Sequence, residues 1–259
     1  MATPRSAPVL SEWYVISLRP SGSHGPVQRA AAALGARVLP LSTLDLVQVE
    51  AGAALDAALA GELVVVTSPA AVEFAHRQRP LAARAGQRWL AVGSGTAEAL
   101  QQVGISGVGM PVGRPDSEGL LALTELQAPA GRSVGVITAP GGRGLIAETL
   151  GQRGARVHLA EVYRRVAVVP TAAQLASLAA LPGTSALLVS SAEAFDGLWG
   201  TLAEPARAQL RARPAVASSP RLAAMLAAQG FAAIVLAPGA TPSRLLEALA
   251  NDVGQGRFR

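Results

Sequence analysis

Hydroxyl side chains recur where a short apolar run of the sequence gives way to a helical pattern. Ser68, Ser219 and Thr241 each precede a proline, and Ser94 and Ser191 open helical stretches without one. At any single junction plain helix capping is the favoured interpretation, because a Ser or Thr oxygen accepts a free N–H group of the first turn. Together, however, such junctions place several helix N-termini at the carboxyl edge of a parallel sheet, which suits a ligand with several carboxylates or phosphates.

A glycine-rich segment provides a second candidate site. Residues Gly142–Ala147 fit the pattern G-x-G-x-x-A after a predicted strand, and Glu161 follows Gly144 by 17 positions (161 minus 144). This spacing is typical of dinucleotide binding. The matching segment in the first half of the chain, Pro20–Gly25, lacks the spacing, and we expect Glu161 in an extended linker rather than at a strand end. A tight strand-to-helix turn is therefore the favoured interpretation, also for the partial match Gly93-Ser94-Gly95.

The composition excludes several kinds of chemistry. The chain contains no cysteine and no lysine, which excludes thiolate nucleophiles, disulfides, Schiff-base lysines and P-loop lysines. His24, His76 and His158 are far apart and lack the spacing of metal ligands, so we expect no metal site. All 22 basic residues are arginines, scattered without interleaved aromatic residues, so we expect no nucleic-acid partner.

The N-terminus and the overall hydropathy predict where the protein acts. Residues Met1–Glu12 lack the basic start and apolar run of a signal peptide, and no stretch approaches the ~20 uncharged apolar residues of a membrane span. We therefore expect a cytoplasmic protein that does not bind a membrane. Aromatic residues make up only 3% of the chain, which leaves few anchors for a protein interface, and we expect a monomer.

Short β-branched apolar runs alternate with Ala/Leu helical patterns along the chain. The predicted strands are 13–18, 36–40, 63–67, 88–92, 107–110, 133–137, 156–160, 185–189, 214–217 and 232–236. The predicted helices are 26–34, 69–78, 94–103, 116–125, 143–153, 172–180, 191–202, 219–229 and 241–250. Nearly continuous apolar strands that alternate with helices are typical of parallel sheets covered on both faces. We predict an α/β fold with doubly wound, flavodoxin-like or Rossmann-like lobes.

The strand–helix pattern occurs twice. Gly35-Ala36-Arg37-Val38 returns as Gly154-Ala155-Arg156-Val157 at an offset of 119 (154 minus 35), and Val64–Ser68 is similar to Leu187–Ser191 at an offset of 123 (191 minus 68). A slowly changing offset indicates a duplication with small insertions, whereas a solenoid shows many short periods. Two similar lobes predict a cleft between them, and clefts between domains are frequent ligand sites.

Two extended stretches interrupt this pattern at matching places in the repeat. Leu41–Glu50 and His158–Val166 mix polar and apolar residues as half-exposed strands do, and we interpret them as paired linker strands between the lobes. Tyr163 lies on the second stretch, beside Arg164 and Arg165. A tyrosine on a half-exposed strand usually serves only packing, but its place at the junction of the lobes makes Tyr163 a candidate functional residue.

An ordered set of short segments runs through nearly the whole chain: Leu18–Pro20, Val66–Val72, Ala91–Leu100, Asp116–Leu121, Gly142–Ala155, Val162–Arg165 and Ser219–Ala223. This set, with its Tyr-Arg pair, resembles the uroporphyrinogen-III synthase family. The resemblance implies two interleaved lobes rather than a simple tandem. The first lobe would comprise 1–39 with 168–259, the second 52–157, and the paired linker strands 40–51 and 158–167.

The resemblance also implies a reaction, in which the linear tetrapyrrole hydroxymethylbilane closes to uroporphyrinogen III with inversion of the last pyrrole and loss of water. The family needs no metal or organic cofactor. Tyr163 matches the proton donor proposed for the family, and the many carboxylates of the substrate suit hydroxyl, backbone and arginine contacts. The expected contact residues are Ser68, Ser94, Thr96, Ser190, Ser191, Ser219, Arg19, Arg143 and Arg221.

Some positions depart from the family pattern. Many relatives carry Arg-Gly where this chain has Thr138-Ala139, and others have a Gly-Pro-Thr-Thr type of turn where it has Ser219-Pro220-Arg221-Leu222. These departures leave open a non-catalytic two-lobed module that binds a tetrapyrrole or another anion. A nucleotide-binding oxidoreductase based on the Gly142–Ala147 segment is the third hypothesis.

Overall fold

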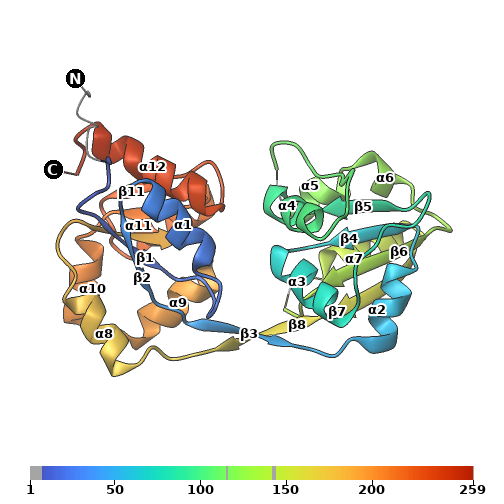
Figure 1. Ribbon diagram of the computed structural model, residues 1–259, viewed down its shortest axis with the longest axis horizontal. Coiled ribbons are helices and arrows are strands. Elements are labelled where there is room, and N and C mark those ends of the chain that lie inside the picture. The colour runs from blue at the N-terminus through green and yellow to red at the C-terminus, as the bar shows by residue number, and fades with distance from the viewer. Residues whose placement is uncertain (1–7, 115, 142–143, 259) are drawn as a thin grey trace, which may run out of the picture. The chain divides into compact units, whose positions relative to one another are not determined.

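The computed structural model describes residues 8–114, 116–141 and 144–258, and its chain divides into two compact units (Figure 1). Unit 1 comprises the chain up to Asp45 and again from Val166 onward, and unit 2 comprises Leu46–Arg165. Unit 2 is therefore continuous in sequence, whereas unit 1 is assembled from both ends of the chain.

Unit 1 is built on a parallel sheet, to which the described residues contribute five strands in the order β11-β10-β9-β1-β2. These strands are β1 (Tyr14–Ser17), β2 (Arg37–Pro40), β9 (Ser185–Val189), β10 (Ala215–Ala217) and β11 (Ile234–Leu236). The helices are α1 (Gly25–Ala33), α8 (Ala172–Ala179), α9 (Ala192–Thr201), α10 (Glu204–Arg211), α11 (Pro220–Ala228) and α12 (Pro242–Gly254). If the five strands are numbered 1 to 5 along the chain, the sheet has the order 2-1-3-4-5, which is that of a flavodoxin-like fold.

Both faces of the unit 1 sheet are covered, as the apolar strands predict. Val15 packs with Val27 of α1 and Leu246 of α12, whereas the next residue, Ile16, packs with Phe195 of α9 on the opposite face. Successive side chains of a strand point to opposite faces, so one apolar strand serves two cores.

Unit 2 has a similar sheet, whose strands numbered along unit 2 lie in the order 2-1-3-4. Its parallel sheet has the order β5-β4-β6-β7 in the described part of the chain. The strands are β4 (Leu63–Val66), β5 (Arg88–Ala91), β6 (Ser133–Thr138) and β7 (Arg156–Glu161). The helices are α2 (Gly52–Leu59), α3 (Pro69–Gln78), α4 (Ser94–Gln102), α5 (Ser117–Leu121), α6 (Thr124–Gln127) and α7 (Leu145–Gln152).

The repeat found in the sequence corresponds to equivalent sheet positions. The Gly-Ala-Arg-Val segments enter β2 and β7, which lie beside β1 and β6, and the Val64 and Leu187 segments form β4 and β9. The α/β fold with parallel sheets is thus confirmed.

Several predicted elements need correction. The strand expected at 107–110 is reduced to a single parallel bridge between Leu90 and Gly109, because two glycines in four residues lower the strand propensity. The helix expected at 116–125 is two short helices, α5 and α6, separated by Leu123 in an extended conformation. Helices α2 and α10 were not predicted. Both begin after an alanine that makes no side-chain capping bond. Helix α2 therefore lacks the usual start signal, whereas α10 carries Glu204 and Pro205 in its first turn, a start signal that was overlooked.

The chain passes between the units in β3 (Leu44–Gln48) and β8 (Tyr163–Ala167), which pair with each other as a two-stranded sheet. The N–H of Val168 donates to the carbonyl of Thr43 (2.9 Å) and that of Val49 to Val162 (3.0 Å), so the two segments run antiparallel. Residues 158–161, expected in the linker, instead pair with β6 as the second half of β7.

The packing of α2 on the unit 2 sheet requires a glycine. A Cβ atom at Gly135, in β6, would lie 2.0 Å from the carbonyl oxygen of Ala58 in α2. Any side chain at this position would push helix and sheet apart.

Candidate functional site

Tyr163, the first residue of β8, is buried in the core of unit 2 rather than half-exposed as expected. Only 3% of its surface is accessible, and its ring stacks on Phe74 of α3 with centroids 5.3 Å apart and an angle of 17° between planes. Its hydroxyl shares a hydrogen bond with Ser68 Oγ at 3.1 Å. The sequence pattern predicted the extended strand at Tyr163 correctly. It did not predict that the ring stacks on Phe74 and is therefore buried.

Ser68 is held in place by its role as the N-cap of α3. Its backbone is extended, its Oγ accepts a hydrogen bond from the N–H of Ala71 (3.0 Å), and Pro69 occupies the first turn. Such a cap contributes about 1 kcal/mol to stability. A serine hydroxyl that accepts one bond still has a proton to donate and a second lone pair, so Ser68 can exchange a hydrogen bond with the Tyr163 phenol in either direction.

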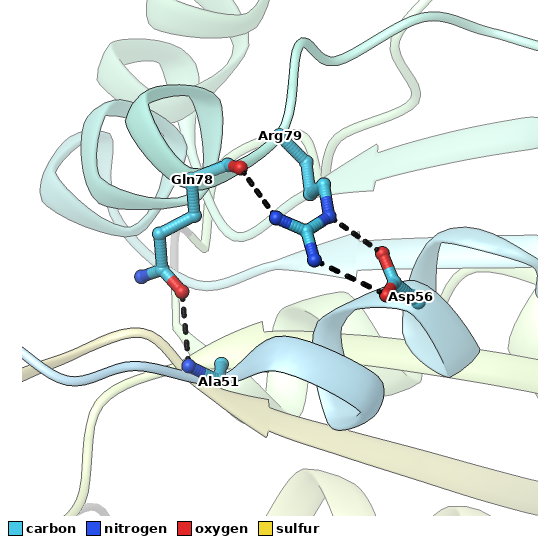
Figure 2. A network of polar contacts seen from close by, with 4 residues as sticks. All are labelled: Ala51, Asp56, Gln78 and Arg79. Atoms are coloured by element: carbon cyan, nitrogen blue, oxygen red, sulfur yellow. Dashed lines mark hydrogen bonds and ion pairs between the residues drawn. The ribbon is translucent and has the colours of Figure 1, made fainter.

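The far end of α3 anchors the strand that carries Tyr163. Gln78 Nε2 donates to the carbonyl oxygens of Val49 (2.9 Å) and Val162 (3.3 Å). Figure 2 shows the other end of this amide, where Gln78 Oε1 accepts from the N–H of Ala51 at 2.9 Å. Helix α3 therefore contacts the tyrosine at two points, through the cap and the stacked ring, and its terminal amide binds the preceding residue, Val162.

An ion pair fixes the end of α3 against α2. Arg79 Nε lies 2.9 Å from Asp56 Oδ1, and Arg79 Nη1 donates to the carbonyl of Gln78 (2.9 Å), as Figure 2 shows. The pair is about half exposed, so its contribution to stability is small, but it favours the orientation in which Gln78 meets Ala51.

A pocket of about 250 Å³ opens at the carboxyl edge of the unit 2 sheet, and the Tyr163–Ser68 pair forms part of its wall. The polar lining residues are Thr67, Ser68, Ser117, Thr138, Glu161, Tyr163 and Arg165, and the backbone contribution includes Gly141 and Gly144. Apolar walls come from β6, β7 and the start of α7. The pocket therefore combines several hydroxyls with a carboxylate and a guanidinium, all within one unit.

Thr67 and Thr138 form a second hydroxyl pair in this pocket. Thr67 Oγ1 donates to Thr138 Oγ1 at 2.8 Å, and the two residues follow or end neighbouring strands, β4 and β6. A hydroxyl pair here can orient a neutral or anionic ligand group, but it contributes no positive charge.

Other predicted contact residues of unit 2 lie near the same edge without lining the pocket. Thr96 is 4% exposed within the first turn of α4, and Ser94 is the first residue of that helix, whose N-cap is Gly93. The two helix starts are adjacent, since a Cβ on Gly95 would lie 3.7 Å from Pro69 Cγ. Arg143 lies outside the described residues.

The remaining predicted residues belong to unit 1. Ser191 caps α9 through the N–H of Ala194 (3.3 Å) and Ser219 caps α11 through that of Leu222 (3.4 Å), which confirms capping at both junctions. Ser190 directly follows β9, and the exposed Arg221 lies in the first turn of α11. Thr241, by contrast, precedes α12 without making a side-chain capping bond.

Arg19 and His24 are linked on the turn that follows β1. The half-buried Arg19 guanidinium makes no hydrogen bond or ion pair with any described residue, and burial lowers its pKa. The Arg19 carbonyl accepts from Ser42 Oγ (2.7 Å), which uses the proton of that hydroxyl. His24 Nε2 must then donate to Ser42 Oγ (2.8 Å), and Nδ1 accepts from Ser17 Oγ (3.0 Å). Burial, and then the charge of Arg19, lower the pKa of His24 and favour this neutral form.

Sequence reasoning missed several members of the site. Phe74 is the one aromatic residue of a helix that was predicted, so its place on α3 was a usable signal. Glu161 was assigned to the linker, but it is the last residue of β7 and lies opposite Thr138 in the β6–β7 register. The role of Gln78 could not be predicted from the sequence, since its partners are backbone groups of distant segments.

The comparisons with known proteins identify the family. The family model described as "Uroporphyrinogen-III synthase HemD" matches residues 26–247. The chain belongs to the uroporphyrinogen-III synthase family. The uroporphyrinogen-III synthase of Salmonella typhimurium is 37% identical over 193 residues, which is 73% of this chain and 78% of that protein. That of Escherichia coli is 34% identical over the same shares of both chains.

Solved structures of uroporphyrinogen-III synthases share the fold. The Helicobacter pylori enzyme aligns with a TM-score of 0.59 at 13% identity, over 92% of this chain and 98% of that one. A triple mutant of the Thermus thermophilus enzyme aligns with a TM-score of 0.56 at 19% identity, over 94% and 99%. At these identities the likeness bears on the fold alone.

In residues 8–114, 116–141 and 144–258, no helix combines the length and apolar character needed to span a membrane. In the same part of the chain, no three His, Asp or Glu side chains gather as ligands for a metal ion.

Proposed function

We propose that Tyr163 is the proton donor of this uroporphyrinogen-III synthase and that the unit 2 pocket receives the part of hydroxymethylbilane that reacts first. The observation that carries the proposal is the buried phenol, stacked on Phe74 and hydrogen-bonded to Ser68, with its residue in the wall of the pocket. A phenol held by a stacked ring and a hydrogen bond from one helix has the fixed position that a general acid needs.

The reaction needs one proton and a defined fold of the substrate. The hydroxyl of the hydroxymethyl group leaves ring A as water once it accepts a proton from the Tyr163 phenol, and ring A then carries a cationic, reactive methylene carbon. Ring D attacks this methylene carbon through its substituted α-carbon and forms a spiro centre. The bond from that α-carbon to the methylene bridge of ring C then breaks and a new bond forms at the free α-carbon of ring D, which inverts the ring. Loss of the proton from that carbon restores the pyrrole and the proton balance. The protein therefore acts mainly by orientation and by preventing the simpler head-to-tail closure.

The size of the pocket limits what it can hold. A volume of about 250 Å³ lies below the ~300–1,000 Å³ of most small-molecule sites. It suits one pyrrole ring with its side chains rather than a whole tetrapyrrole. We propose that Ser68, with Ser94 and Thr96 nearby, receives substrate carboxylates through hydroxyls and free N–H groups of the α3 and α4 starts.

We further propose that unit 1 supplies carboxylate contacts. Arg19 is the strongest candidate, because its half-buried guanidinium lacks a partner among the described residues. A carboxylate can pair with it in a bidentate manner. The other proposed contacts of unit 1 are Ser190, Ser191, Ser219 and Arg221. Arg19→Met should raise KM for hydroxymethylbilane more than it lowers kcat, and an unchanged KM would remove Arg19 from binding.

An isomer assay tests the catalytic proposal. Hydroxymethylbilane is supplied to the purified protein, and the products are oxidised and separated as type I and type III porphyrins. We expect type III to form at a rate proportional to protein concentration, and type I alone would contradict the proposal. Tight binding of the substrate without turnover would instead favour a non-catalytic tetrapyrrole-binding module.

A nucleotide site is the second candidate, and the position of Glu161 favours it. Gly144 precedes α7 with a left-handed backbone, and Glu161 ends the next strand and lines the same pocket, as in a dinucleotide-binding unit. Family membership favours the synthase. A rise in melting temperature with NAD(P) would support a nucleotide site, and no change would count against it.

We propose in addition that the protein works as a cytoplasmic monomer on this small-molecule substrate. The low aromatic content supports a monomer, since large anchors for an interface are few. Light scattering coupled to size-exclusion chromatography tests the oligomeric state. A mass of twice 26.2 kDa would contradict it.

A further inference from the structure

Arg213 in unit 1 is a buried cation that the proposed reaction does not use. It follows α10 and is 8% exposed. Its Nη1 donates to the carbonyl of Pro182 (3.1 Å) and to the hydroxyl of Ser185, and its Nη2 donates to the carbonyl of Leu181 (3.2 Å). Burial lowers the pKa of the guanidinium. These acceptors follow the C-terminus of α8, where the negative end of the helix dipole also favours a cation.

The partners of Arg213 are all neutral. No carboxylate among the described residues lies within ion-pair distance of it, so its charge has no counter-ion in that part of the chain. A guanidinium has five N–H groups, and the three bonds leave Nε and one hydrogen of Nη2 without an acceptor. Every fully buried polar side-chain atom in the described chain has a partner, so the unbonded Nε must reach accessible space.

Arg213 lines a largely apolar pocket of about 270 Å³. The other walls come from α8, α10 and the segment between α9 and α10, and include Leu175, Leu178, Leu202, Ala206 and Leu210. Apolar walls lower the local polarity and so strengthen any charge interaction at Arg213. The volume exceeds the ~150 Å³ of an apolar cavity that holds benzene.

We propose that this pocket binds a small apolar monocarboxylate, a molecule with a benzene-sized apolar body and one carboxylate. The carboxylate accepts the unused N–H groups of Arg213, and the body fills the space between the leucines and Ala206. The chemistry differs from that of the tetrapyrrole substrate, whose many carboxylates do not suit a pocket with one cation and apolar walls. The site therefore stands apart from the proposed catalytic pocket, which lies in unit 2.

Calorimetric titration of the full-length protein with benzoate and with benzamide tests the proposal. Benzamide has nearly the same shape without the charge, and we expect it to bind at least about tenfold more weakly, as befits the loss of a charge-assisted hydrogen bond. Equal binding of the two compounds would overturn the role of Arg213. Absence of benzoate binding up to about 10 mM would overturn the site itself.

A pair of variants of α10 locates the binding. Ala206→Leu places a larger side chain in the pocket and leaves Arg213 itself unmutated. We expect it to weaken benzoate binding at least about tenfold. Ala208→Leu makes the same change at an exposed position of α10 that does not line the pocket, and benzoate binding should stay unchanged. Equal benzoate affinity in both variants would place any binding elsewhere and overturn the proposal. Both variants keep Arg213, so any contribution of Arg213 to folding is the same in the two measurements.

Discussion

Replacement of Tyr163 by phenylalanine separates catalysis from packing. The variant removes one hydroxyl and keeps the ring that stacks on Phe74 with centroids 5.3 Å apart. The lost interaction is the hydrogen bond to Ser68 Oγ at 3.1 Å. A partly buried hydrogen bond between neutral groups contributes about 0.5–1.5 kcal/mol to stability. Ser68 keeps its other bond to Ala71, so it is not left without a partner.

The two expected effects of Tyr163→Phe differ greatly in size. A loss of about 1 kcal/mol lowers the melting temperature of a domain the size of unit 2 by roughly 4 °C. Loss of a general acid slows a reaction by about 10²–10⁴-fold. We therefore expect a folded protein whose rate of type III formation is at least about 100-fold reduced.

The assay measures the initial rate of type III porphyrin formation and the thermal unfolding curve on the same preparation. Ser68→Ala is the matched control, because it removes the same hydrogen bond and the α3 cap but keeps the phenol. It should cost about 2 kcal/mol of stability, the sum of the cap and the hydrogen bond. Because Ser68 is also a proposed carboxylate contact, we expect it to raise KM for hydroxymethylbilane and to lower kcat much less than Tyr163→Phe does. If Tyr163→Phe retains half or more of the wild-type rate, the phenol is not the proton donor.

Three further predictions concern the surroundings of the site and the two cores. Gly135→Ala should destabilise unit 2 by about 3 kcal/mol or more, because its Cβ would lie 2.0 Å from a backbone oxygen. The control Gly151→Ala in α7 meets nothing within 4 Å and should stabilise the protein by up to ~1 kcal/mol. Chemical denaturation measures the unfolding free energy of both variants. Gln78→Leu should lower kcat while the protein stays folded, because the backbone next to Tyr163, the proposed proton donor, loses its anchor, and an unchanged kcat would refute this. The pKa of His24 is lowered in the folded state, so the unfolded chain binds more protons as the pH falls. The contribution of His24 to the free energy of unfolding is therefore complete above pH ~6.5 and is lost as the pH falls through the folded-state pKa. His24→Gln should flatten the fall in unfolding free energy between pH ~7 and ~5, and equal slopes would contradict the lowered pKa.

Local patterns in the sequence predicted much of the fold. Buried strands such as Leu63–Val66 are continuous apolar runs, and helix starts such as that after Ser68 combine a capping hydroxyl with proline. Helix α2 begins without a capping side chain, and its sequence alone does not mark a start. Helix α10 also lacks a cap, but Glu204 and Pro205 in its first turn were a usable start signal. The prediction of a strand at 107–110 was wrong, because a glycine-rich segment can run beside a sheet with only one bridge to it.

The candidate site was less accessible to sequence reasoning, because its contacts join distant segments. Tyr163 and Ser68 were both singled out, yet their separation of 95 positions gave no reason to place them 3.1 Å apart. Gln78 binds backbone carbonyls, which every residue possesses, so no side-chain pattern reveals its role. Glu161 was misplaced because the end of β7 and the start of β8 are separated only by Val162.

The ratio of type III to type I porphyrin, measured at increasing protein concentration with a fixed supply of hydroxymethylbilane, tests the central claim most directly. Our account predicts that type III rises with protein concentration until it dominates the product. A product that stays type I at every concentration of folded protein would contradict it.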